Sequence, residues 1–114
     1  MTTADATAAF FDGLARRGQE PLLAGAVGSL RFDLVGDPEV DTWLVRLHDG
    51  DVTVSREQAA ADCVARCDKR LFDSIAAGEV NAMAALLRGA LRFEGDPELL
   101  VRLQRLFPSP PAHR

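Results

Sequence analysis

The chain has 114 residues, which predicts a single domain with one hydrophobic core. Its formal net charge of −4, with the basic residues scattered, argues against a nucleic-acid-binding surface. No apolar run reaches the ~18 residues that a membrane span needs, and the first residues lack the pattern of a secretion signal. We therefore expect a cytoplasmic protein that binds no nucleic acid and has no transmembrane segment.

The first half of the chain predicts one helix followed by three strands. Apolar residues at three- and four-residue spacing predict a helix over about residues 4–18. From Gly28 the apolar period changes to two, as in half-buried strands, and Asp49-Gly50 is a strong hairpin signal. The apolar faces of the three expected strands are Leu30, Phe32 and Leu34; then Trp43, Val45 and Leu47; then Val52 and Val54.

The second half predicts two further strands and three helices. Cys63 to Cys67 alternates as a strand, and Asp68 is expected to cap a helix that ends at Gly78. Asn81 is expected to cap a short helix that Gly89 closes, and Asp96 to cap a last helix that begins at Pro97. Between these two helices, Leu91 and Phe93 alternate with polar residues as the last strand, and the Pro-rich residues 108–114 are expected to be a disordered tail.

The fold class that follows is α+β. About five short strands, each with one apolar face, form a mixed or mostly antiparallel sheet. About four helices with apolar stripes cover one face of this sheet, which gives a two-layer domain over residues 1–107.

The sequence does not predict catalysis, a metal or a cofactor. His48 stands at a strand end and His113 in the tail, so neither is placed beside a nucleophile. Cys63 and Cys67 share one strand face about 13 Å apart, which is too far for one metal ion, and are expected to be buried thiols. We therefore expect a protein that is not an enzyme.

Apolar side chains of the last three helices and the last strand converge within 36 residues. They can form a filled core, which is the plainer interpretation, or they can line a cavity for an apolar ligand. The candidates for ligand binding are Phe72, Ile75, Met83, Leu86, Leu87, Leu91, Phe93, Leu99, Leu103, Leu106 and Phe107.

The order and spacing of these elements resemble the sterol carrier protein 2 (SCP2-like) family over residues 10–107. The resemblance rests on Asp62-Cys63-Val64, Asp68, Leu71-Phe72, Ile75-Ala76-Ala77-Gly78, Asn81, Ala84, Gly89 to Asp96, Leu99, Leu103 and Leu106-Phe107, with Asp41 to Val45 and the Asp49-Gly50 turn before them. Where relatives often have proline after the asparagine, this chain has Ala82. Its last residues do not match a peroxisomal address, which fits a bacterial or stand-alone cytosolic member.

The resemblance implies a five-stranded SCP2-like fold with a hydrophobic tunnel between sheet and helices. It implies a carrier for a lipid or other long-chain apolar small molecule, such as a sterol, fatty acid, fatty acyl-CoA or isoprenoid. Of the eleven candidates, it assigns ligand contact to all but Ile75, Leu87 and Leu106. The alternative is a module with a filled core that acts through a protein partner or a homodimer, with the surface around Leu100 and Val101 as its interface.

Overall fold

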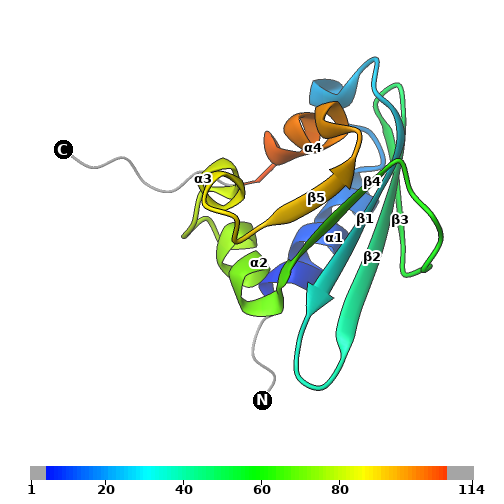
Figure 1. Ribbon diagram of the computed structural model, residues 1–114. Helices are drawn as coiled ribbons and strands as arrows, with labels where there is room; N and C mark the ends of the chain where they lie inside the picture. Colours follow the sequence, from blue (N-terminus) through cyan, green and yellow to red (C-terminus); the bar gives the residue numbers. More distant parts are fainter. Residues whose placement is uncertain (1–4, 108–114) are drawn as a thin grey trace.

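A sheet and a layer of helices make up the fold (Figure 1). The structure, a computed structural model, describes residues 5–107, so His113 and the expected tail lie outside the described residues. The elements are α1 (Ala6–Arg17), the 3-10 turn η1 (Pro21–Leu23), β1 (Val27–Val35), β2 (Val40–His48), β3 (Asp51–Ser55), β4 (Cys63–Asp68), α2 (Lys69–Ala76), α3 (Ala82–Leu87), β5 (Arg92–Gly95) and α4 (Pro97–Gln104).

The five strands form one mixed sheet in the order β3-β2-β1-β4-β5. β1 and β4 are parallel, and the other neighbouring pairs are antiparallel. Phe32 of β1 lies opposite Trp43 of β2 and Ala65 of β4, and Ala65 lies opposite Phe93 of β5. The predicted α+β class with a mixed sheet is confirmed.

The hairpin between β2 and β3 turns at the predicted dipeptide. Asp49 and Gly50 both have positive φ, 49° and 93°, as the two-residue turn that matches strand twist requires. The Asp49 carboxylate accepts a hydrogen bond from the Gly25 amide at 2.7 Å, which ties this turn to the segment before β1.

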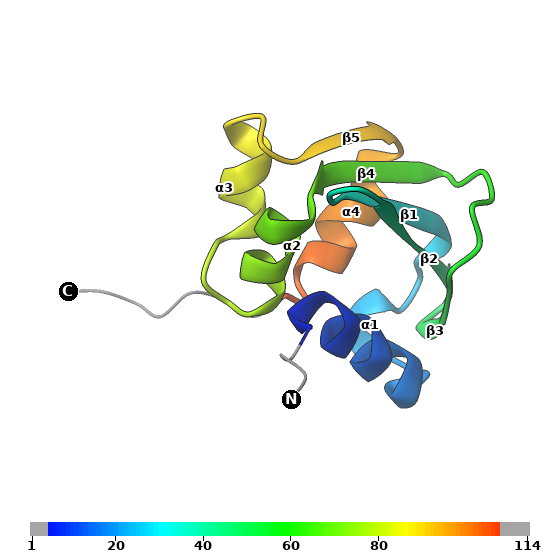
Figure 2. The same ribbon diagram turned by 90° about the horizontal axis from the view of Figure 1, so that it is seen from below.

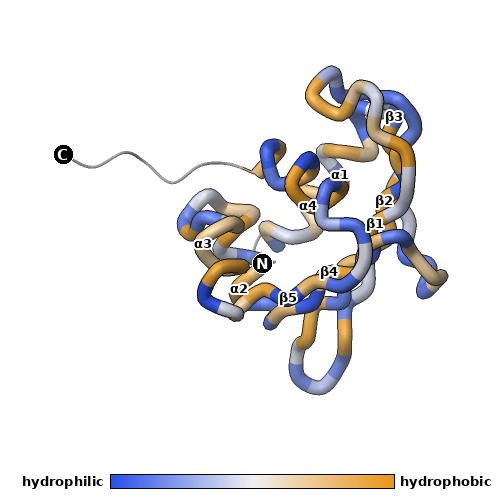
Figure 3. Tube along the Cα trace, turned by 45° about the horizontal axis from the view of Figure 1, so that its top comes forward, coloured by the Kyte–Doolittle hydropathy of each residue, from blue (hydrophilic) through white to orange (hydrophobic). Residues whose placement is uncertain are grey.

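The helices cover one face of the sheet, and the connection from β3 to β4 crosses the other face (Figure 2). Arg31 donates a hydrogen bond to the Ala59 carbonyl of this connection at 3.0 Å. Leu44 points away from the helices, yet its exposed fraction is only 1%, because the connection covers its face. Figure 3 shows hydrophobic and hydrophilic residues alternating along the strands, as a sheet with one apolar and one more polar face requires.

Three of the four helix N-termini are capped by side chains. Asp5, Asn81 and Asp96 each accept a hydrogen bond from a backbone amide of the first helical turn. The prediction that the Asp68 side chain caps α2 is wrong. Asp68 occupies the N-cap position of α2, but its side chain makes no capping hydrogen bond. Gly89 closes α3 with a φ of 81°, as predicted.

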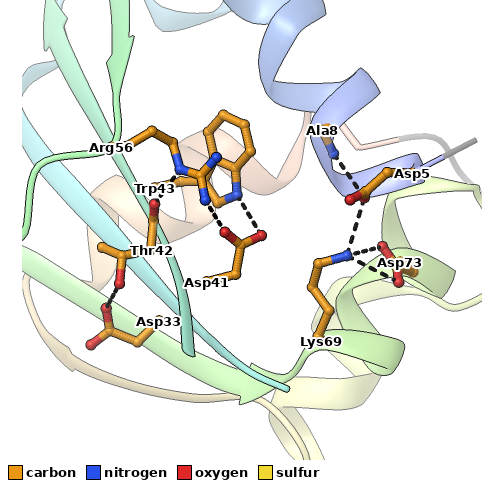
Figure 4. A network of polar contacts seen from close by, with 9 residues as sticks. All are labelled: Asp5, Ala8, Asp33, Asp41, Thr42, Trp43, Arg56, Lys69 and Asp73. Atoms are coloured by element: carbon orange, nitrogen blue, oxygen red, sulfur yellow. Dashed lines mark hydrogen bonds and ion pairs between the residues drawn. The ribbon is translucent and has the colours of Figure 1, made fainter. Parts of the chain in front are cut away.

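Polar contacts attach α1 to the start of α2 (Figure 4). The Lys69 ammonium lies 3.1 Å from a carboxylate oxygen of Asp5 and 3.1 Å from one of Asp73. The buried Thr7 hydroxyl donates to Asp73 at 2.6 Å. These contacts join the beginning of α1 to the first turns of α2.

Candidate functional site

An apolar cavity lies between β1, α2, α3 and the last helix, on the helical side of the sheet. Nine of its lining residues are apolar and one is an amide. They are Phe32, Phe72, Ile75, Ala82, Met83, Leu86, Leu91, Leu100, Gln104 and Phe107. Sites for small molecules in proteins have this character, with mostly apolar walls and few polar groups.

The cavity is narrow in this structure. The empty space between the lining side chains, open mouth included, is about 330 Å³. The centre of a water-sized sphere can reach only about 10 Å³ of it. Drug-sized ligands occupy pockets of about 300–1,000 Å³. A long apolar ligand therefore fits only if the walls move apart.

α3 is the helical wall whose buried side chains are the smallest. Of its six residues, only Ala82 and Ala85 are buried. Met83 and Leu86 are half-buried and line the cavity, and Leu87 is 82% exposed. α3 is therefore anchored by two small side chains, whereas α2 and α4 are anchored by Phe72, Ile75 and three leucines.

The opposite wall is aromatic and firmly supported. Phe72 of α2 and Phe107, just after α4, meet edge to face with ring centroids 5.5 Å apart. Outside the cavity, Phe11 of α1 stacks on Phe72 at 5.6 Å, and Phe10 stacks on Phe107 at 4.6 Å. The helix α1 therefore holds this wall in place without lining the cavity itself.

Gln104 is the polar residue in this lining. It follows Leu100 by four positions and precedes Phe107 by three, so the three side chains share one stripe of the chain's last turns. Its amide can donate and accept hydrogen bonds. A ligand with a carboxyl or hydroxyl end can use this group, while its chain contacts the apolar walls.

The structure brings six of the eleven predicted site residues to the cavity. These are Phe72, Ile75, Met83, Leu86, Leu91 and Phe107. The other five do not line it: Leu87 points to solvent, Leu99 and Leu103 are buried in the core, and Phe93 and Leu106 are half-buried against it. Helical spacing predicts an apolar stripe, but which part of that stripe meets a cavity depends on how the helices pack.

Four further residues line the cavity that the sequence does not predict there: Phe32, Ala82, Leu100 and Gln104. Phe32 belongs to the first strand, outside the convergent segment, and Ala82 is too small to stand out. Leu100 and Gln104 share a stripe with Phe107, and that spacing was available in the sequence. The alternative of an interaction module predicts Leu100 in an exposed interface; this prediction is wrong, because the exposed fraction of Leu100 is 3%.

The cysteine thiols are buried, and their pKa values are raised. Cys63 and Cys67 are free and lie on the inner face of β4. Burial, with a smaller contribution from the Asp96 charge, raises the pKa of Cys63 to about 11. Burial and the Asp68 charge raise the pKa of Cys67 to about 12. Both groups therefore stay protonated at neutral pH, and thiols are much weaker nucleophiles and ligands than thiolates.

Over residues 5–107, no three histidine, cysteine, aspartate or glutamate side chains come together as a metal site. His48 is exposed at the end of β2. No helix in this part of the chain is both long and apolar enough to cross a bilayer.

Family and structural comparisons point to one family. The model of the SCP-2 sterol transfer family matches residues 4–108. The chain belongs to this family. No curated protein is similar enough in sequence to count as a relative. The family membership confirms the resemblance of the sequence motifs.

Several solved structures have the same fold as this chain at low sequence identity. Palmitated SCP2L2 from Aedes aegypti has a TM-score of 0.71 and 16% identity, with 99% of this chain and 100% of that chain covered. Apo sterol carrier protein 2 from Yarrowia lipolytica has a TM-score of 0.67 and 19% identity, with 93% and 92% covered. The inverting sec-alkylsulfatase Pisa1 from Pseudomonas sp. has a TM-score of 0.68 and 24% identity; 95% of this chain is covered but only 17% of the sulfatase.

Proposed function

We propose that this chain is a non-catalytic, cytoplasmic carrier that holds a long-chain apolar ligand between the sheet and α2, α3 and α4. The observation that carries the proposal is the cavity lining, in which nine apolar side chains surround a single amide. Burying each methylene group contributes about 0.8 kcal/mol, so an acyl chain can bind without a charged partner. A fatty acid, fatty acyl-CoA, sterol or isoprenoid matches this chemistry.

Binding requires the cavity to widen, and α3 is the wall that moves. The aromatic wall is held by Phe10 and Phe11 of α1, whereas α3 is held mainly by two alanines. Met83 and Leu86 also have flexible side chains that can repack around ligands of different shape. Membership of the SCP-2 sterol transfer family and the fold shared with a palmitated protein support this function.

Neighbouring residues of α3 provide a matched test. Leu86 lines the cavity and Leu87 is 82% exposed. Leu86→Glu places a charge among apolar walls and is expected to weaken binding of a fluorescent fatty acid at least tenfold. Leu87→Glu is expected to leave that affinity unchanged, and circular dichroism checks that both variants are folded. Equal affinities for the two variants would contradict the proposed site.

Native mass spectrometry of the purified protein, followed by lipid extraction, identifies the ligand class. We expect a co-purified long-chain lipid or isoprenoid that is lost in Leu86→Glu. The alternative function is that of a module with a filled core acting through a homodimer or a protein partner. It is favoured by the narrowness of the cavity, and a ligand-free protein that also fails to bind fluorescent fatty acids would support it.

A further inference from the structure

We propose that two copies of this chain pair along the free edge of β5 and form a dimer with one continuous sheet. β5 is the last strand in the order β3-β2-β1-β4-β5 and forms one border of the sheet (Figures 1 and 2). Among residues 5–107, β4 is the only strand that pairs with it. An edge strand carries backbone donors and acceptors that another strand can use. The pairing is separate from the proposed carrier function, because Arg92, Phe93 and Glu94 do not line the cavity.

Phe93 is the residue of β5 whose backbone groups face the free edge. The Asp96 amide donates to the Asp62 carbonyl at 2.9 Å, and these two residues lie opposite each other when the β4–β5 register is continued. Hydrogen-bonded and non-bonded pairs alternate between antiparallel strands. Glu94 and Arg92 therefore bond to β4, whereas the N–H and C=O of Phe93 point away from it.

A two-fold axis at Phe93 makes this edge complementary to itself. When a second β5 runs antiparallel and is centred on this residue, the two copies of Phe93 exchange two backbone hydrogen bonds. The residues on either side then face each other, so Arg92 of each copy lies opposite Glu94 of the other. Opposite charges at facing positions of neighbouring strands are stabilising. Both charge pairs lie on the outer face of the sheet, away from the helices.

The charges of β5 have no ion-pair partner within residues 5–107. Arg92 and Glu94 are exposed, and neither takes part in an ion pair there. Arg92 lies directly opposite Arg66 of β4, and like charges at such positions are destabilising. A second copy gives Arg92 the carboxylate that it lacks. This charge complementarity favours a second copy of the chain over an unrelated strand as the occupant of the edge.

The inner face of the edge also accepts a second copy. Phe93 is half-buried, and the register places it beside Phe93 of the second copy, where the two rings can pack together. Leu91 lies opposite Gly95 of the second copy, which has no side chain to obstruct it. The paired strands are short, so the interface is small and we expect a reversible dimer with a Kd on the order of 100 μM.

Sedimentation velocity of the full chain over about 10 μM to about 1 mM measures this equilibrium. We expect the average mass to rise from monomer toward dimer. Arg92→Glu and Glu94→Arg each place like charges opposite each other at both ends of the pairing, and each is expected to raise the Kd at least tenfold. Arg92→Glu also removes the repulsion from Arg66, so loss of the dimer is not explained by a less stable chain. Circular dichroism checks the folding of both variants.

A mixture of the two charge-reversed variants tests the register itself. In a heterodimer of Arg92→Glu with Glu94→Arg, both facing positions again carry opposite charges. We therefore expect the equimolar mixture to dimerise at least as tightly as the unmodified chain, although each variant alone stays largely monomeric. A mixture that remains monomeric would overturn the antiparallel pairing centred on Phe93.

Control variants reverse exposed charges away from β5. Arg16→Glu at the end of α1 and Glu79→Arg before α3 are expected to dimerise as the unmodified chain does. The proposal is overturned if the unmodified chain stays monomeric throughout the concentration range, or if the controls lose as much affinity as the β5 variants. Amide hydrogen exchange gives a second readout, in which protection of the Phe93 amide should rise with concentration. A dimer in which this amide stays unprotected would overturn pairing through the β5 edge.

Discussion

The Phe10 ring stacks on the Phe107 ring with centroids 4.6 Å apart and planes inclined by 20°. One ring belongs to the first helix and the other to the last described residue, so the two ends of the fold meet behind the cavity. Phe107 lines the cavity and Phe10 does not. The first helix therefore affects ligand binding through an aromatic contact that supports the wall.

Phe10→Ala removes that support. We expect it to lower the free energy of unfolding by about 2 kcal/mol, since the ring is half-buried and stacked. It should also weaken fatty-acid binding. Without Phe10 the Phe107 side chain is more mobile, and ordering it when the ligand binds costs free energy. Phe93→Ala is the control, as Phe93 is half-buried against the core outside the cavity. A Phe93→Ala variant that loses more affinity than Phe10→Ala would contradict this account. Urea denaturation and fluorescence titration measure both quantities.

Gln104→Leu tests the polar group of the lining. The amide is expected to bond to the polar end of a bound chain, and one such bond contributes about 1 kcal/mol, which is about fivefold in affinity. The ratio of palmitate to methyl palmitate affinity should therefore fall about fivefold, because the ester lacks the charge that makes the bond strong. Competition with a fluorescent fatty acid gives both affinities. An unchanged ratio would show that Gln104 does not contact the polar end.

The Lys69 contacts predict a stability difference that depends on pH. Burial alone would raise the pKa of Asp5, but hydrogen bonds from the Ala8 amide and Lys69 outweigh it and lower that pKa below 3.8. The stability from this carboxylate is therefore present above pH 3.8 and lost as pH falls through the lowered value. Lys69→Met should cost about 1 kcal/mol at neutral pH. Urea denaturation should show the cost of Lys69→Met shrinking as pH falls below 3.8. A cost that stays constant as pH falls would mean that packing of the Lys69 side chain causes it.

The buried thiols predict slow chemical labelling. With pKa values of about 11 for Cys63 and about 12 for Cys67, both remain protonated at pH 8. Iodoacetamide should therefore label them only after unfolding, as mass spectrometry can follow. Because these folded-state pKa values lie above the ordinary 9.0, unfolding should become easier as pH rises above 9 toward about 11 and 12. Rapid labelling of the folded chain would show that β4 opens readily.

Local chemistry made much of the fold predictable from the sequence. Asp49-Gly50 marks a turn that only a few residue types adopt, and Asn81 and Asp96 supply cap oxygens where helices begin. The period of two placed Phe32 and Trp43 on the same face of the sheet. These features depend on neighbours in the sequence, so the sequence alone is sufficient to find them.

The limits of the cavity depend on packing between distant segments. Leu103 and Leu100 lie three residues apart on one helix, yet Leu103 is in the core and Leu100 lines the cavity. Leu44 is buried because the β3–β4 connection crosses a face that its strand pattern marks as polar. Such placements are set by tertiary contacts, which residue spacing does not contain.

Methyl NMR during titration with palmitate tests the central claim most directly. The account predicts the largest shifts at methyl groups of the cavity lining, Ile75, Met83, Leu86, Leu91 and Leu100, and small shifts at Leu30 and Leu47, which are buried outside it. Leu87, on the solvent side of α3, should shift less than Leu86. Saturating palmitate that shifts none of the lining methyl groups, or only groups elsewhere, would contradict a ligand site in this cavity.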